Sequence, residues 1–78
     1  MKMNNDRRKA IAVIISSIEE LKSKAEDILN EEQEAYDNMP EGLQQSERGE
    51  LSGEAISDLE NAISSLEDVS SSLEEASQ

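Results

Sequence analysis

Apolar residues recur in alternating steps of three and four over residues 10–36. With Ile11 placed at heptad position a, Ile15, Leu29 and Tyr36 fall at e and widen the stripe, and Glu32 is the one polar interruption. Positions a and d are otherwise apolar: Ile11, Ile14, Ile18, Leu21, Ala25, Ile28 and Ala35. This spacing is typical of an amphipathic helix. The pattern predicts a helix whose apolar stripe covers residues 10–36. It starts near Asn4 or Asn5, either of which can cap it, and runs to about Tyr36.

The second half of the chain repeats the scheme. With Leu59 at position a, Ile56 and Ile63 fall at e, and the a and d positions are Ala55, Leu59, Ala62, Leu66, Val69, Leu73 and Ala76. The pattern predicts a helix over residues 46–78, beginning at Ser46 or Glu50. Gly49 and Gly53 lie four residues apart and each weakens a helix by about 1 kcal/mol. They indicate either an irregular first turn or the close approach of another backbone.

Residues 37–45 separate the two helices and carry the signals of a turn. Pro40 disfavours a helical conformation at Met39, and Asn38 is able to end a helix. Two long helices joined by so short a segment must run antiparallel. We therefore expect an all-α fold, an antiparallel two-helix hairpin, in a single domain of residues 1–78 that begins with a basic N-terminal arm over 1–9.

The width of the apolar stripe and the length of the chain both favour self-association. A stripe of a, d and e positions is wide enough to face more than one helix. A chain of 78 residues buries little surface alone, and it has no cysteine and no histidine to supply a disulfide or the usual zinc ligands. We expect an even-numbered homo-oligomer, in which hairpins pack face to face into a helical bundle.

The charge is strongly negative and unevenly distributed. The net charge is −12, but residues 1–9 carry four bases (Lys2, Arg7, Arg8 and Lys9) against the single acid Asp6. A body this acidic repels phosphate backbones, so generic nucleic-acid binding is not expected. The acidic surface is either a solvated helix surface or an imitation of DNA that docks on a basic protein.

Membrane insertion, catalysis and metal binding are not expected. No apolar run approaches the roughly 20 residues of a membrane span, and no targeting segment is convincing, which predicts a cytoplasmic protein. The acids at outward positions lie in no predicted cleft, so we expect no enzyme and no cofactor. An acidic cluster ends the first helix (Glu31, Glu32, Glu34 and Asp37), but the calcium-loop pattern with its central glycine is absent, and a solvated cluster is favoured over a metal site.

The residues around the turn form the one candidate binding site. Tyr36 is the only aromatic residue, and Arg48 is the only cation after Lys24. An antiparallel pair places both at one end, together with Gln44 and Ser46. An aromatic face, a guanidinium group and polar side chains are the groups that hold a nucleotide. The alternative interpretation is structural: Tyr36 closes the core and Arg48 pairs with a nearby glutamate.

A resemblance rests on residues 31–49, which read EEQEAYDNMPEGLQQSERG. The segment resembles the centre of a group of small phage and prophage helical-hairpin proteins, in which an acidic helix ends in Tyr/Phe-Asp-Asn, followed by Pro-Glu, Leu-Gln and Glu-Arg-Gly. The close match covers about a quarter of the chain, and the helix patterns extend it over most of the rest. The sequence departs from the pattern at Leu51-Ser52-Gly53, where a continuous helical pattern would be expected.

The group is similar to the anti-CBASS nucleotide sponges, which sequester cyclic nucleotide immune signals without turnover. The resemblance implies a tetramer-like assembly in the cytoplasm of the host cell, with a cyclic dinucleotide or related signal as ligand. It implies binding by Tyr36, Gln44, Ser46 and Arg48, with Arg7 and Arg8 contributed by a neighbouring subunit. Two alternatives remain: an acidic protein-binding inhibitor or DNA mimic, and a purely structural oligomerisation module.

Overall fold

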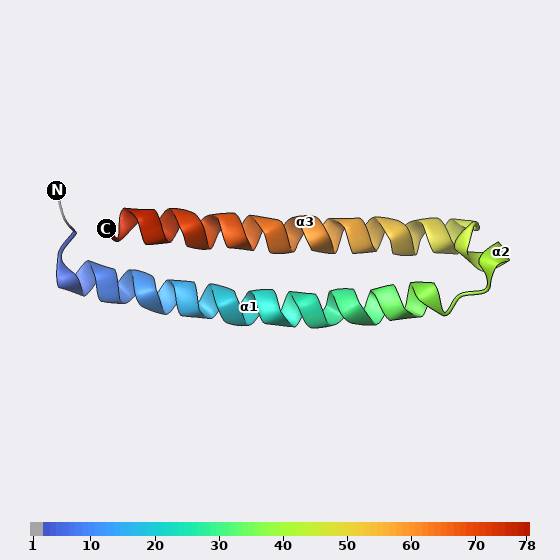
Figure 1. The fold of residues 1–78 in the computed structure, drawn as a ribbon, viewed down its shortest axis with the longest axis horizontal. Coiled ribbons are helices and arrows are strands. Elements are labelled where there is room, and N and C mark those ends of the chain that lie inside the picture. Colours follow the sequence, from blue (N-terminus) through green and yellow to red (C-terminus); the bar gives the residue numbers. More distant parts are fainter. Residues whose placement is uncertain (1–2) are drawn as a thin grey trace.

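A computed structural model describes residues 3–78 and contains three helices (Figure 1). These are α1 (Asn5–Asp37), α2 (Glu41–Gln44) and α3 (Glu47–Ala76). No strand occurs in the described residues, which confirms the predicted all-helical class. Within the same residues, no helix combines the length and the apolar character that crossing a membrane requires.

The two long helices lie side by side and run in opposite directions (Figure 1). The resulting rod has Cα extents of 58 × 17 × 12 Å. The start of α1 and the end of α3 lie at one end, and α2 lies at the other. Every functional group near the turn is therefore separated from the start of α1 by nearly the length of the molecule.

The helix ends follow local signals in the sequence. Asn4 caps α1, because its side-chain Oδ1 accepts a hydrogen bond from the Arg7 backbone N–H at 2.9 Å. Asn38 ends α1 and Ser46 precedes α3, as the sequence predicts. Pro40 precedes α2, where its missing N–H costs no helical hydrogen bond.

Two predicted boundaries differ from the structure. The predicted helix start near Asn4 or Asn5 is confirmed, and it makes residues 5–9 of the predicted arm, Arg7 and Arg8 included, part of α1. Met1 and Lys2 of that arm lie outside the described residues. The predicted turn over residues 37–45 contains the helical turn α2. Of the two alternatives for Gly49 and Gly53, an irregular first turn is not observed, since α3 is continuous from Glu47. The close approach of another backbone is found at Gly49, against Gln44.

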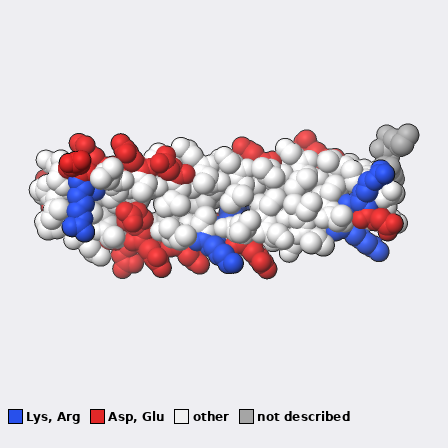
Figure 2. Space-filling view, turned by 180° about the vertical axis from the view of Figure 1, so that it is seen from behind, with Lys and Arg blue, Asp and Glu red and all other residues white. Residues whose placement is uncertain are grey.

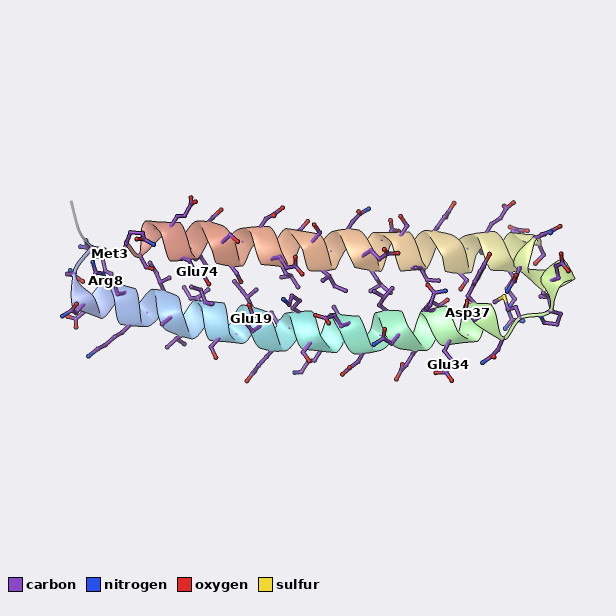
Figure 3. All side chains as sticks on the ribbon, viewed as in Figure 1. Met3, Arg8, Glu19, Glu34, Asp37 and Glu74 are labelled. Carbon is purple, nitrogen blue, oxygen red and sulfur yellow. The ribbon has the colours of Figure 1, made fainter. Side chains whose placement is uncertain are left out.

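Of the predicted stripe of a, d and e positions, the seam between α1 and α3 uses a and e. Buried and half-buried residues of α1 recur at Ile11, Ile15, Ile18, Lys22, Ala25, Leu29, Glu32 and Tyr36. Those of α3 recur at Gly49, Ser52, Ile56, Leu59, Ile63, Leu66, Ser70 and Leu73. The side chains from these two rows fill the space between the helices (Figure 3).

The size of the side chains explains this choice of seam. A stripe three positions wide can turn only two of them towards a single neighbouring helix. On α3, position e supplies Ile56 and Ile63, whereas position d supplies Ala55 and Ala62. Burial of the larger side chains removes more apolar area from water, and each Å² removed stabilises the folded chain by about 25 cal/mol. The isoleucines of α3 therefore favour the a and e seam, even though position e of α1 brings Lys22 into it.

The seam also contains polar residues, and one pair of them is satisfied within it. The Ser52 hydroxyl donates to Glu32 Oε1 at 2.6 Å, so the polar interruption in α1 has a partner on α3. Ser70 is buried, and its hydroxyl has no hydrogen-bond partner among the described residues. A buried hydroxyl without a partner costs free energy that an alanine methyl group would not.

Replacement of Ser70 by alanine is expected to raise the free energy of unfolding by about 1 kcal/mol, because it removes an unsatisfied buried hydroxyl and improves helix propensity. Urea unfolding followed by circular dichroism measures the change. The matched control is Ser71→Ala, at an exposed neighbouring position, which gains only the propensity term of a few tenths of a kcal/mol. A Ser70→Ala protein less stable than the parent would contradict the prediction.

Candidate functional site

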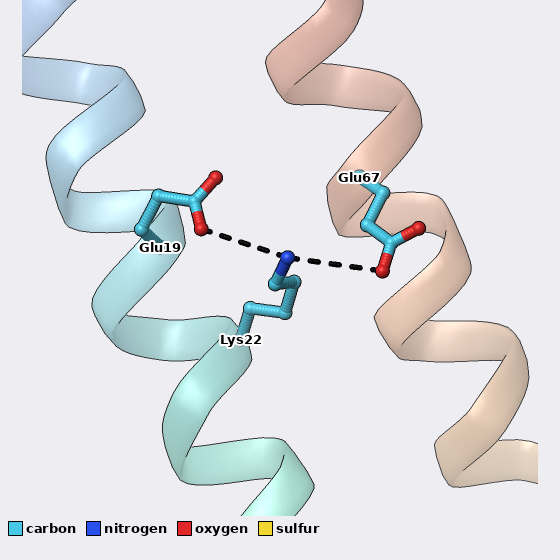
Figure 4. Close-up of polar contacts among 3 residues, drawn as sticks. All are labelled: Glu19, Lys22 and Glu67. Carbon is cyan, nitrogen blue, oxygen red and sulfur yellow. Dashed lines mark ion pairs between the residues drawn. The ribbon is translucent and has the colours of Figure 1, made fainter.

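One long side of the helix pair is acidic. An open groove of about 340 Å³ runs between the helices there and is lined by Glu26, Leu29, Glu60, Ile63, Ser64 and Glu67. Lys22 lies beside it, with its Nζ 3.5 Å from Glu19 Oε2 and 3.7 Å from Glu67 Oε1 (Figure 4). These long, partly exposed contacts contribute little stability. The carboxylates of the groove disfavour an anionic ligand.

We name the row formed by Glu19, Glu26, Glu60, Glu67 and Glu74 the acidic face. Each of these residues directly follows a seam residue at position a. They were predicted to point away from the core, but they flank the seam, because the seam lies at a and e rather than at a and d. One consequence is that carboxylates from both helices meet along a single side of the molecule.

The opposite side of the seam carries an apolar face, which we define by two rows at position d. On α1 the row is Ile14, Leu21, Ile28 and Ala35, and on α3 it is Ala55, Ala62, Val69 and Ala76. Position b, which follows a, lies on the acidic side of the seam. Position d, which precedes e, lies on the opposite side, so the two rows at position d meet there. Figure 2 views this side and shows a broad uncharged band along the middle of the rod.

The large side chains of the apolar face are open to solvent. The exposed fraction is 47% for Ile14, 54% for Leu21, 54% for Ile28 and 47% for Val69. Single exposed apolar residues are ordinary, but a row that follows two helices along their length marks an interaction surface. No partner helix within the described chain covers it.

At the turn, two predicted site residues serve the fold itself. Gln44 Nε2 donates to the Tyr36 backbone carbonyl at 2.9 Å and ties α2 to the end of α1. The Ser46 hydroxyl donates to the Leu43 carbonyl. Both side chains therefore have internal partners, which a ligand would have to replace or share.

Tyr36 and Arg48 lie at the turn end, as the antiparallel arrangement requires. Tyr36 is half-buried at the last seam position of α1, whereas Arg48 is exposed in the second residue of α3. Both ion pairs found within residues 3–78 involve Lys22, so Arg48 pairs with no carboxylate there. The predicted alternative for Arg48, pairing with a nearby glutamate, is thus not observed in this part of the chain.

Arg7 and Arg8 lie at the opposite end of the rod from Tyr36 and Arg48. Figure 3 places Arg8 next to Met3 at the end that holds both termini, whereas Asp37 lies near the turn. Arg7 is exposed and Arg8 is half-buried, with an Nε that has no hydrogen-bond partner among the described residues. One chain therefore does not bring these two arginines to the candidate site.

The acids at the end of α1 are Glu31, Glu32, Glu34 and Asp37. Among residues 3–78, no group of three or more Asp, Glu, His or Cys side chains is arranged to hold a metal ion. Their position is compatible with the fold, because the N-terminus of the antiparallel α3 lies at the same end. The positive end of that helix dipole offsets the repulsion between the acids and the C-terminus of α1.

Sequence reasoning missed the two features that organise the surface. It treated position d as core, and it did not place Lys22, Ser52 or Ser70 in the seam. The presence of apolar residues at a, d and e was the available signal, since one neighbouring helix cannot cover all three.

Comparison with known proteins identifies no relative. No family model matches the chain, and neither curated proteins nor solved structures show significant similarity to it. The functional argument therefore rests on the surfaces described above.

Proposed function

We propose that this protein is a non-enzymatic helical module that acts by self-association, forming a homo-oligomeric bundle through its apolar face. The proposal rests on the exposed apolar side chains of one face, which are Ile14, Leu21 and Ile28 on α1 and Val69 on α3. These side chains occupy regular helical positions beside the seam. A second helix pair is the simplest structure able to cover both rows at once.

The small core supports the same conclusion. Ile18 and Ile56 are the only apolar side chains within residues 3–78 that are classed as buried. Chains of this size commonly need an additional source of stability. The broad side of the rod measures 58 × 17 Å between Cα atoms, roughly 1,000 Å², which exceeds the about 800 Å² per partner of a standard interface.

A glutamate in the middle of the apolar face should prevent assembly. Leu21→Glu is expected to weaken self-association at least 100-fold, because each copy would bury an unpaired carboxylate. Sedimentation velocity ultracentrifugation measures the mass, which for the parent protein should be a multiple of the 8.6 kDa chain.

The matched control is Val13→Glu, next to the apolar face but outside it, at a residue that is 66% exposed. It adds the same charge and should leave the assembly intact. A parent protein that sediments as a monomer at 100 μM would refute self-association. An assembly that tolerates Leu21→Glu as well as Val13→Glu would place the interface elsewhere.

A second candidate function is the sequestration of a cyclic nucleotide at the turn end. The exposed guanidinium of Arg48, unpaired within residues 3–78, is the observation that favours it. In an oligomer with the turns together, Tyr36 and Arg48 from neighbouring chains would line the site. Arg7 and Arg8 would lie at the far end of the assembly, so the site proposed here does not include them. No chemical turnover is proposed, since the site is one for binding only.

Cyclic di- and trinucleotides are expected to raise the thermal unfolding temperature if this second function is correct. A ligand at about 100 times its dissociation constant stabilises by roughly 2.7 kcal/mol per site. The shift should disappear in Arg48→Ala while the oligomer persists. The control is Lys9→Ala, which removes an exposed cation from the opposite end of the rod. A flat response over the whole panel would eliminate the sponge and leave self-association unaffected.

A further inference from the structure

We infer that the partner on the apolar face is a second copy of this chain with its turn at the same end, so that α1 of each copy packs against α3 of the other. The inference rests on the proposed self-association and specifies its geometry. A face-to-face pair with twofold symmetry has two simple arrangements. Either the turns lie together and α1 meets α3, or the turns lie at opposite ends and each helix meets its own counterpart.

Side-chain size distinguishes the two arrangements. On the apolar face, α1 presents the large residues Ile14, Leu21 and Ile28, whereas α3 presents mainly Ala55, Ala62 and Ala76. When α1 packs against α3 of the second copy, large side chains meet small ones on both halves of the interface. In the other arrangement, large side chains meet large ones while alanines meet alanines, which leaves either a clash or a void.

Docking through the apolar face also gives less electrostatic repulsion between the two chains than docking through the acidic face. Each chain carries a net charge of −12, and the acidic face would place rows of glutamates against each other. Docking through the apolar face keeps those glutamates on the outside of the bundle. It also places Arg48 of both copies at one end of the assembly.

Spin labels at the turn test the orientation directly. The chain has no cysteine, so Gln45→Cys, at an exposed position, accepts a single nitroxide label. Pulsed electron–electron double resonance should give a distance of about two helix diameters, roughly 20–25 Å. A distance close to the 58 Å length of the rod would overturn the orientation while preserving self-association. A monomer without any dipolar signal would overturn both.

Discussion

Replacement of Gly49 by alanine is expected to destabilise the protein by about 3 kcal/mol, the upper end of the usual cost of overpacking. Gly49 is buried at the start of α3, and a Cβ there would lie 2.6 Å from Gln44 Cα and closer still to the Gln44 carbonyl group. The obstructing atoms belong to the backbone, so no side-chain rotation relieves the clash. The turn itself would have to move.

Replacement of Gly53 by alanine is expected to stabilise the protein. A Cβ at Gly53 meets no atom within 4 Å, and alanine favours a helix over glycine by about 1 kcal/mol. Chemical unfolding of both variants therefore measures a difference of about 4 kcal/mol between two glycines one turn apart. Equal effects at both positions would show that helix propensity, and not the approach of Gln44, determines the cost at Gly49.

The Gly49 variant also tests how the turn end is built. Gln44 contacts Gly49 through its backbone and the Tyr36 carbonyl through its side chain. A displacement of Gln44 would therefore loosen both α2 and the end of α1. If the nucleotide function is correct, Gly49→Ala should reduce binding more than its loss of stability alone explains, whereas Gly53→Ala should preserve it.

Ile18→Ala is expected to lower the free energy of unfolding by about 2–5 kcal/mol, the range for truncating a buried isoleucine. Ile18 is 8% exposed and shares the buried apolar core of the seam with Ile56. A domain this small has only a few kcal/mol of stability to lose. Circular dichroism at 25 °C should therefore show a largely unfolded chain, or one that folds only at high protein concentration.

Val13→Ala is the matched control for Ile18→Ala. Both changes replace a β-branched residue in α1, but Val13 is 66% exposed. Alanine is the better helix former, so the control should be neutral or slightly stabilising. Ile18 is at position a, which an a and d seam would also contain, so position d decides between the two seams. A loss of stability from Leu21→Ala as large as that from Ile18→Ala, at every protein concentration, would show that position d lies in the seam.

The dependence of stability on protein concentration distinguishes the seam from the apolar face. Loss of Ile18 weakens the pairing of α1 with α3 and lowers stability at every protein concentration. Loss of Leu21 removes contacts made between copies, so its effect on the unfolding temperature should grow as the concentration of the parent protein rises. The two measurements together distinguish a core residue from an interface residue on adjacent turns of one helix.

The local structure of this protein was predictable because local interactions decide it. The alternating three- and four-residue spacing predicted the helical class, and Asn4, Asn38 and Ser46 mark helix ends as expected. The contrast between the two glycines was not predictable. Gly49 and Gly53 have similar sequence surroundings, but only the return of the chain through α2 places Gln44 against one of them.

For the candidate binding site, the sequence predicted which residues of the turn lie at the same end of the molecule, but it did not predict their contacts. The antiparallel arrangement was sufficient to place Tyr36, Gln44, Ser46 and Arg48 at one end. The internal hydrogen bonds of Gln44 and Ser46 depend on the conformation of α2, which the sequence pattern did not predict. The separation of Arg7 and Arg8 from that end follows from the length of α1.

By itself, the sequence determined two amphipathic helices, their ends and an apolar stripe three positions wide. The tertiary structure alone decided which two positions face the neighbouring helix and which is left exposed. The physical reason is that periodicity is a property of one helix, whereas a seam depends on the side chains of both. The preference for burying Ile56 and Ile63 over Ala55 and Ala62 left Leu21 and Ile28 on the surface, and with them the face through which this protein is proposed to assemble.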